Sequence, residues 1–173
     1  MKICIIGGSG FVGSRLLSLF KDFDLLNIDK NPSIQNQKIT LIHNICESLI
    51  DIGSLKGTDV IIHLAAEHTD NVSPKSLYYD VNVNGTKNII AAAEKYNIKK
   101  IIFTSSVAVY GLNKECPDEY SIPDPFNHYG KSKLEAEKLL VDWLRKDELN
   151  RTLILIRPTV IFGERNRGNF YNL

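Results

Sequence analysis

The chain has 173 residues, enough for one ordinary domain whose core needs neither a metal nor a disulfide for stability. Its 21 basic and 20 acidic side chains leave a formal charge of +1, which gives no general attraction to nucleic acid or to a membrane surface. The three cysteines lack disulfide or metal-binding spacing and no stretch reaches the length of a membrane span, so we expect a cytoplasmic protein.

Short apolar runs alternate with longer amphipathic stretches, which is typical of a doubly wound parallel sheet with helices on both faces. The expected strands are Lys2 to Ile6, Leu25 to Asp29, Ile39 to Asn44, Val60 to Leu64, Lys100 to Ser105 and Thr152 to Arg157. The expected helices are Phe11 to Lys21, Ser48 to Lys56, Lys75 to Tyr96, interrupted only by Gly85, and Tyr129 to Lys146. Between the fifth expected strand and the last expected helix, Gly111 to His128 is expected to form a long irregular loop near a site.

The segment "GGSGFVGSRL" joins the first expected strand to the first expected helix. Its glycines fit both the G-x-G-x-x-G spacing and the wider G-x-x-G-x-x-G spacing. A sharp turn requires positive φ, and only a backbone without side chains lets a pyrophosphate reach the helix N-terminus. We therefore predict a Rossmann-type α/β fold whose single domain, residues 1–173, binds a dinucleotide. The residues expected to contact it in this turn are Gly7, Gly10, Phe11, Val12 and Gly13.

Asp29 ends the second expected strand, where a carboxylate can accept hydrogen bonds from an adenosine ribose. An acid there also repels a 2′-phosphate, which favours NAD over NADP, although Lys30 moderates this preference. The alternative interpretation is that Gly13 only permits close helix packing and Asp29 only caps a turn. It explains each residue singly but not their combination.

Tyr129 and Lys133 lie four residues apart at the start of the last expected helix, on the face of its apolar stripe. A free phenol has a pKa of about 10, so a base near neutrality needs about 4 kcal/mol of preference for the phenolate. An ammonium ~5 Å away supplies about 3 kcal/mol at an effective dielectric of ~20, and the positive ring of oxidised nicotinamide can supply the rest. The pair therefore predicts a base that works once NAD is bound.

The segment "FTSSVAVYG" ends the fifth expected strand and offers Ser105 and Ser106 as hydroxyls that could hold a substrate oxygen. Open α/β sheets bind ligands at the carboxyl ends of their strands. A Y-x-x-x-K spacing alone is common by chance. The glycine turn and the serines are what favour a catalytic interpretation of Tyr129.

The chain resembles the extended branch of the short-chain dehydrogenase/reductase family, in particular its NAD-dependent nucleotide-sugar epimerases and dehydratases. The matching segments are "GGSGFVG", Asp29, "HLAA" at 63–66, "YYDVNVNGT" at 78–86, "SSVAVYG" at 105–111, "YGKSK" at 129–133 and "RPTVIFG" at 157–163. Members of this branch continue into a smaller domain that grips the nucleotide sugar. The resemblance therefore implies that this chain is the cofactor-binding portion, with the substrate-binding domain absent.

The resemblance also implies roles for individual residues. Tyr129 would be the general base, Lys133 would lower its pKa and bond the nicotinamide ribose, and Ser106 would hold the reacting sugar hydroxyl. Further cofactor contacts are implied for Leu64, Ala65, Ala66, Asn82 and Pro158. Asn44 stands where an aspartate commonly contacts adenine, and an amide oxygen can still accept that bond, so Asn44 and Ile45 are kept as expected contacts.

One departure from the family pattern bears on the reaction. Sugar 4,6-dehydratases of the family carry acids directly after the serine or threonine, whereas this chain has Val107 and Ala108. We therefore expect 4-epimerisation through a transient keto-sugar. The alternatives are a dehydratase, keto-sugar reductase or decarboxylase of the same family, and a non-catalytic dinucleotide-sensing module.

The remaining conspicuous residues receive simpler interpretations. The four histidines share no metal spacing, so no metal site is expected. "ERNR" at 164–167 is interpreted as a solvated charge run, with contact to a substrate phosphate as the alternative. The two long helices resemble those that the family pairs in a four-helix bundle, which implies a homodimer.

Overall fold

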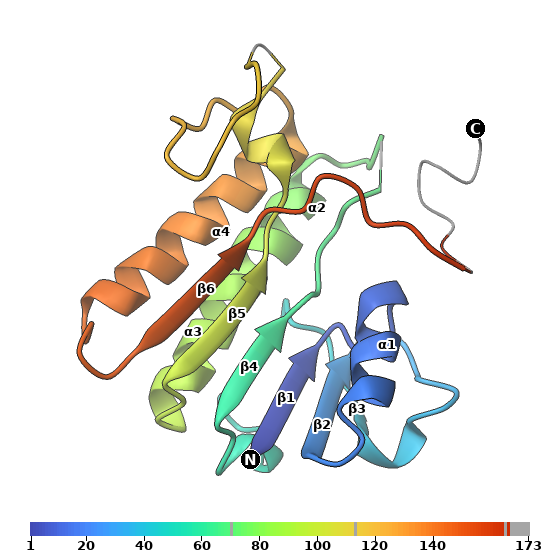
Figure 1. The fold of residues 1–173 in the computed structure, drawn as a ribbon. Coiled ribbons are helices and arrows are strands. Elements are labelled where there is room, and N and C mark those ends of the chain that lie inside the picture. Colours follow the sequence, from blue (N-terminus) through green and yellow to red (C-terminus); the bar gives the residue numbers. More distant parts are fainter. Residues whose placement is uncertain (70, 113, 165, 167–173) are drawn as a thin grey trace.

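A computed structural model of the chain describes residues 1–69, 71–112, 114–164 and 166. Its sheet contains six parallel strands in the order β3–β2–β1–β4–β5–β6 (Figure 1). This is the strand order of a doubly wound Rossmann-type sheet, so the predicted fold class is confirmed. The strands are β1 (Lys2–Ile6), β2 (Asp24–Asp29), β3 (Thr40–Ile42), β4 (Val60–His63), β5 (Lys100–Thr104) and β6 (Thr152–Ile156).

Helices cover both faces of the sheet. In Figure 1, α1 (Phe11–Leu19) lies on one face, and α3 (Gly85–Lys95) and α4 (His128–Arg145) lie side by side on the other. Two short segments, α2 (Ser76–Tyr79) and the π-helical η3 (Asp80–Asn84), lead directly into α3. Within the described part of the chain, no helix is long and apolar enough to cross a bilayer.

The two sides of the sheet have separate apolar cores, because successive residues of a strand point to opposite faces. On β1, Ile3 and Ile5 pack with Leu17 of α1. Cys4 and Ile6 face the other way and join the larger cluster under α3 and α4. Burial raises the pKa of the Cys4 thiol to about 12, so this cysteine is an inert core residue.

The predicted helix over 48–56 is wrong. Only the 3₁₀ helix η2 (Gly53–Leu55) forms there, and the preceding residues make turns. Leu49 and Leu55 are both buried, so irregular backbone can point apolar side chains into the core at a spacing that imitates a helix. Turn residues and a helical stripe are hard to separate over so short a segment.

The predicted interruption of the helix over 75–96 lies before Gly85 and not at it. The π-helical turn occupies Asp80–Asn84, and Gly85 begins the regular α3. A Cβ at Gly85 would lie 2.6 Å from Ile45 Cδ1, so glycine is required there by close packing and not by a break in the helix. The predicted charge run at 164–167 includes Arg165 and Arg167, which lie outside the described residues, as does the end of the predicted domain.

Candidate active site

The glycine turn lies between β1 and α1, at the point where the strand order of the sheet reverses. Gly7 has a φ of 88°, and a Cβ there would lie 2.6 Å from the amide nitrogen of Ala65. A Cβ on Gly13 would lie 2.4 Å from Gly8 Cα. The first glycine therefore permits the turn and the second permits the helix to pack directly on it.

The N-terminus of α1 presents backbone N–H groups that no side chain of the helix caps. Gly10 is the N-cap, it has no side chain to cap the helix, and the first turn carries no acid. The backbone N–H groups of Phe11, Val12 and Gly13 therefore lack intrahelical acceptors. Free N–H groups together with the helix dipole bind anions, so this end of α1 fits a diphosphate.

Asp29 lies at the end of β2 and is 9% exposed. Its Oδ2 accepts from Ser9 N at 2.9 Å and its Oδ1 accepts from Asn31 N at 2.8 Å. The carboxylate thus fixes the glycine turn, as the capping interpretation expected. Each oxygen has a second lone-pair position, so ribose hydroxyls fit the same group.

The two predicted adenine contacts, Asn44 and Ile45, differ in burial. Asn44 is exposed after β3, and its Oδ1 accepts from Cys46 N at 3.1 Å. The backbone of His43 donates to Asp29 O, which keeps this loop beside β2. The Ile45 side chain is buried in the core, and its backbone carbonyl accepts from Asn88 Nδ2 at 2.8 Å.

The segment after β4 runs beside the glycine turn. The N–H groups of Leu64 and Ala65 donate to Ile6 O at 2.8 and 3.0 Å. Ala66 follows, and all three predicted contacts in this segment are half-buried. The structure therefore brings them next to the residues that fit a diphosphate.

Asn82 is buried in η3, and its amide connects two elements. Its Oδ1 accepts from Glu67 N at 2.8 Å, and its Nδ2 donates to Glu67 O at 3.0 Å. The same Nδ2 donates to Ser132 Oγ at 2.9 Å, and Ser132 Oγ donates to Tyr129 O at 2.8 Å. Asn82 therefore holds the loop after β4 against the first turn of α4.

Tyr129 lies in the first turn of α4, half-buried, where Asn127 caps the helix by accepting from Gly130 N at 2.7 Å. Burial raises the pKa of Tyr129, while a side-chain hydrogen bond with Ser106 acts in the opposite direction. Ser106 Oγ also accepts from the backbone N of Ala108 at 3.1 Å. The net direction is upward, and Lys133 is not among the causes, so the expected lowering of the Tyr129 pKa by Lys133 is not found.

The two candidate serines, Ser105 and Ser106, have different surroundings in the structure. Ser106 is the one that acts on the pKa of Tyr129, whereas the hydroxyl of Ser105 is buried without a partner among the described residues. Pro158, the last predicted cofactor contact, follows β6, and its carbonyl accepts from Val107 N at 3.1 Å. It thus lies beside the 3₁₀ helix η4 (Val107–Tyr110) that follows Ser106.

Lys133 is 1% exposed, one turn after Tyr129. Its Nζ donates to Thr104 O at 2.7 Å, at the carboxyl end of β5, and lies 4.1 Å from the centroid of the Phe103 ring. Burial lowers the pKa of Lys133 to about 7, and the charge of Glu137 opposes that shift. The ammonium is thus buried at the same strand end as Ser106.

A buried ion pair behind Lys133 was not predicted. Arg157 donates from Nε to Glu137 Oε1 at 2.9 Å and from Nη2 to Oε2 at 2.6 Å. Its Nη1 donates to the Tyr110 hydroxyl at 2.7 Å. The spacing of Glu137, four residues after Lys133 on the same helix face, places an acid near Lys133 but gives no signal for Arg157 as its partner.

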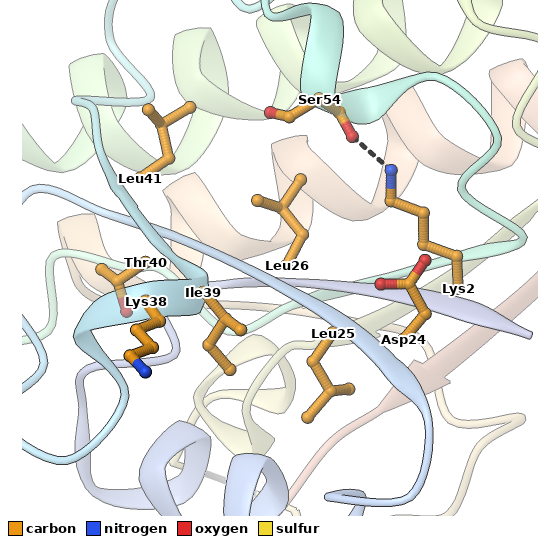
Figure 2. A pocket seen from close by; sticks show the side chains of 9 residues that line it. All are labelled: Lys2, Asp24, Leu25, Leu26, Lys38, Ile39, Thr40, Leu41 and Ser54. Carbon is orange, nitrogen blue, oxygen red and sulfur yellow. Dashed lines mark hydrogen bonds between the residues drawn. The ribbon is translucent and has the colours of Figure 1, made fainter.

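The opposite end of the sheet carries a hollow of ≈ 360 Å³ near the amino ends of β1 and β2 and around β3, shown in Figure 2. Lys2 in its wall donates from Nζ to the carbonyls of Ser54 and Lys56. Parallel sheets bind ligands at their carboxyl ends, so we assign it no function. The described residues contain no group of three or more side chains that could hold a metal ion.

Comparison with known proteins places this geometry in a family. Residues 3–172 match the model of the NAD dependent epimerase/dehydratase family. The chain belongs to this family. Its members are NAD-dependent by description, and the glycine turn, the free end of α1 and Asp29 are the parts of the chain that fit this cofactor.

Three family relatives are 4-epimerases by name. An N-acetyl-alpha-D-glucosaminyl-diphospho-ditrans,octacis-undecaprenol 4-epimerase of Escherichia coli O157:H7 is 57% identical over 99% of this chain and 52% of its own length. A UDP-glucose 4-epimerase of Vibrio cholerae is 31% identical over 99% of this chain and 55% of its own.

The third is a solved structure, the UDP-N-acetylglucosamine 4-epimerase of Methanobrevibacter ruminantium M1 in complex with UDP-N-acetylmuramic acid. It matches with a TM-score of 0.85 and 26% identity, over 97% of this chain and 57% of that one. The chain thus spans about half the length of the curated relatives that it matches.

Proposed function

We propose that residues 1–173 are the NAD-binding portion of a 4-epimerase that acts on a hexosyl diphosphate. The observation that carries this proposal is that Ser106 follows β5, Lys133 of α4 bonds to the last carbonyl of β5, and Tyr129 lies one turn before Lys133, with β4 between this strand end and the glycine turn after β1. The family membership and the names of the relatives support the reaction.

The chain would hold NAD through groups already described. The N–H groups of Phe11, Val12 and Gly13 would bind its diphosphate, with Gly7 and Gly10 allowing close approach. Asp29 would accept from the adenosine ribose, Lys133 would donate to the nicotinamide ribose, and the remaining contacts would come from the loops after β3, β4 and β6. When bound, NAD would take up a hydride from C4 of the sugar and return it to the opposite face.

The protein residues would handle the proton of the C4 hydroxyl. Tyr129 would accept this proton as the C4 carbonyl forms and return it as the hydroxyl is restored. Ser106 would orient the same oxygen, and the Lys133 ammonium would favour the phenolate. Val107 and Ala108 offer no acid for loss of the C6 hydroxyl, which supports epimerisation over 4,6-dehydration.

Two substrate classes share the hexosyl diphosphate. Nucleotide sugars are favoured by the UDP-sugar epimerases among the relatives. A sugar diphosphate on a polyprenol is favoured by the higher identity, 57%, to the undecaprenol-linked enzyme. The two classes differ only beyond the diphosphate, in a part of the substrate that Ser106 and Tyr129 do not contact.

The test uses the protein expressed from its complete coding sequence. UDP-N-acetylglucosamine and N-acetylglucosaminyl diphosphoprenol are each incubated with it, and the C4 epimers are separated by chromatography. Tyr129→Phe is expected to lower kcat by 10²–10⁴-fold on the active substrate while NAD binding persists. Wild-type rates in this variant, or no epimer from either substrate, would contradict the proposal.

Calorimetry with this chain tests the cofactor preference. We expect NAD to bind more tightly than NADP because Asp29 repels a 2′-phosphate. Asp29→Asn should narrow the difference. Equal affinity of the wild-type chain for both dinucleotides would remove the role given to Asp29.

We also propose a homodimer through α3 and α4 and a cytoplasmic location. The two helices lie together on one face of the sheet, where Ala91 is exposed and Leu139 half-buried (Figure 1). The three cysteines are unpaired, and two of them are exposed, which suits a reducing compartment. Light scattering after gel filtration measures the oligomeric state.

A further inference from the structure

A buried hydrogen-bond chain joins the end of β4 to the segment that holds Asn82. His63 is the last residue of β4 and is 0% exposed. Its Nε2 lies 3.1 Å from Thr86 Oγ1, and Thr86 is equally buried at the start of α3. Thr86 Oγ1 in turn donates to the backbone carbonyl of Asn82 at 2.6 Å.

The hydroxyl of Thr86 fixes the tautomer of His63. A threonine hydroxyl has one hydrogen, and Thr86 gives it to Asn82 O. The contact with His63 therefore requires a hydrogen on Nε2, which leaves Nδ1 as the unprotonated nitrogen. His63 Nδ1 is buried without a partner among the described residues, and burial together with the Lys133 charge lowers the pKa of His63 to about 3. The ring is therefore a neutral N–H donor at physiological pH.

The hydrogen-bond chain ends at Asn82, the residue that connects the loop after β4 to the first turn of α4. Thr86 holds the backbone of Asn82, while the Asn82 amide bonds both backbone groups of Glu67 and the hydroxyl of Ser132. Asn82 lies in a π-helical turn, a rare conformation that frequently occurs at functional sites. The Thr86 hydroxyl donates to the backbone of this turn at Asn82 O.

We propose that His63 and Thr86 are positioning residues of the candidate active site. They fix Asn82 in the turn and thereby set the placement of the loop after β4 relative to the first turn of α4, which carries Tyr129. The effect on turnover rests on the proposed function. The hydrogen-bond chain and its effect on the loop beside the glycine turn do not.

The decisive variants remove or keep one hydroxyl. Thr86→Val keeps the shape but removes the hydroxyl bond to the Asn82 carbonyl and leaves the His63 N–H unpaired, whereas Thr86→Ser keeps the hydroxyl. Thr58 is the matched control, because its hydroxyl is buried without a partner before β4, far from Tyr129. Thr58→Val therefore makes the same chemical change outside the hydrogen-bond chain.

The first readout needs no turnover. Nitrogen-15 NMR of the 173-residue chain should show His63 protonated on Nε2 only and not titrating between pH 5 and 8. Calorimetry should show NAD affinity lowered at least fivefold by Thr86→Val and within twofold of wild type for Thr86→Ser and Thr58→Val. A proton on Nδ1, or equal NAD affinity in all four proteins, would overturn the proposal.

The second readout uses the protein from its complete coding sequence. We expect Thr86→Val to lower kcat by 10–100-fold with the KM for the sugar changed less than threefold, and Thr86→Ser to restore the rate. Equal losses in Thr86→Val and Thr58→Val would indicate a merely structural effect and overturn the proposal. If the wild type produces no epimer, the proposed function fails, and the NMR and calorimetry still decide the role of His63 and Thr86. If Thr86→Val does not fold, His63→Gln, which retains an N–H, and His63→Leu replace the pair in the same assays.

Discussion

Lys133 shows how a functional charge can oppose folding. Its ammonium is buried, and its pKa falls from 10.5 to about 7. Between these two values the unfolded chain holds a proton that the folded chain releases, so stability rises with pH there. Below pH 7 both states are protonated and the full penalty is present. At one pKa unit per 1.36 kcal/mol, this penalty is on the order of 5 kcal/mol.

We expect Lys133→Met to stabilise the chain at pH 6, since the penalty that it removes outweighs the hydrogen bond to Thr104 and the contact with the Phe103 ring that it loses. The net gain should be about 2–4 kcal/mol, shrink as the pH rises through 7, and vanish toward pH 10. Urea unfolding at a series of pH values measures it. A gain that does not depend on pH would show that the charge of Lys133 is not the cause.

Glu137 and Arg157 form the opposite case, an ion pair in which removing one charge lowers stability. Their side chains are 4% and 18% exposed. Both oxygens of Glu137 accept from Arg157. Glu137→Gln should destabilise the chain by about 3–5 kcal/mol, because it leaves the guanidinium without its counter-charge. Glu94→Gln is the control and should cost under about 1 kcal/mol, because Glu94 pairs with Lys146 and Arg151 at the surface. Equal losses in urea unfolding would contradict this difference.

At the residue scale, the sequence predicted positions that depend on fixed local spacing. Tyr129 and Lys133 on one face of α4, and Ser105 and Ser106 after β5, could be placed because helix periodicity and strand ends determine where they lie, whereas the choice of Ser106 came from the family resemblance. The partners of Thr86 and Glu137 were not found, since they come from distant segments that only the folded sheet brings together. The placement of Ile45 in the core was missed for the same reason.

Among the elements, the glycine turn depends on backbone meeting backbone. A Cβ on Gly13 would lie 2.4 Å from Gly8 Cα and 2.7 Å from Gly7 O. We expect Gly13→Ala to destabilise the chain by about 1–3 kcal/mol and to weaken NAD binding, because α1 must move away from the turn. Gly53→Ala is the control, since a Cβ there meets nothing within 4 Å. Thermal unfolding and calorimetry compare the two, and an unchanged Gly13→Ala protein would refute the role of packing.

The expected elements with strong periodicity were largely correct, and those with weak periodicity were not. The central strands and α4 appear close to their predicted bounds, because long apolar patterns leave few alternatives. The π-helical turn before α3 could not be predicted. A π-helical turn contains one residue more than an α-helical turn, and so small a change leaves the sequence pattern almost the same. The bond from the Asn82 amide in this turn to Ser132 of α4 is a contact that only the tertiary structure provides.

For the whole molecule, β6 is a weakly protected edge of the sheet. It is one of the two edge strands of the described sheet, and Ile154 and Ile156 are 47% and 45% exposed on it. Exposed apolar edge strands associate with other chains. We expect this chain to self-associate at high concentration and Ile154→Lys to reduce that association, as measured by static light scattering. A lysine at Leu149, which is exposed but lies outside β6, should change nothing.

The order of the strands also affects how the chain folds during synthesis. β1 is made first but is central in the sheet, with β2 on one side and β4 on the other. A ribosome that has released only the first 50 residues therefore exposes a chain whose apolar first strand has one open side. That side closes only when residues 60–63 emerge, and until then its unpaired strand edge leaves the nascent chain prone to association with other chains.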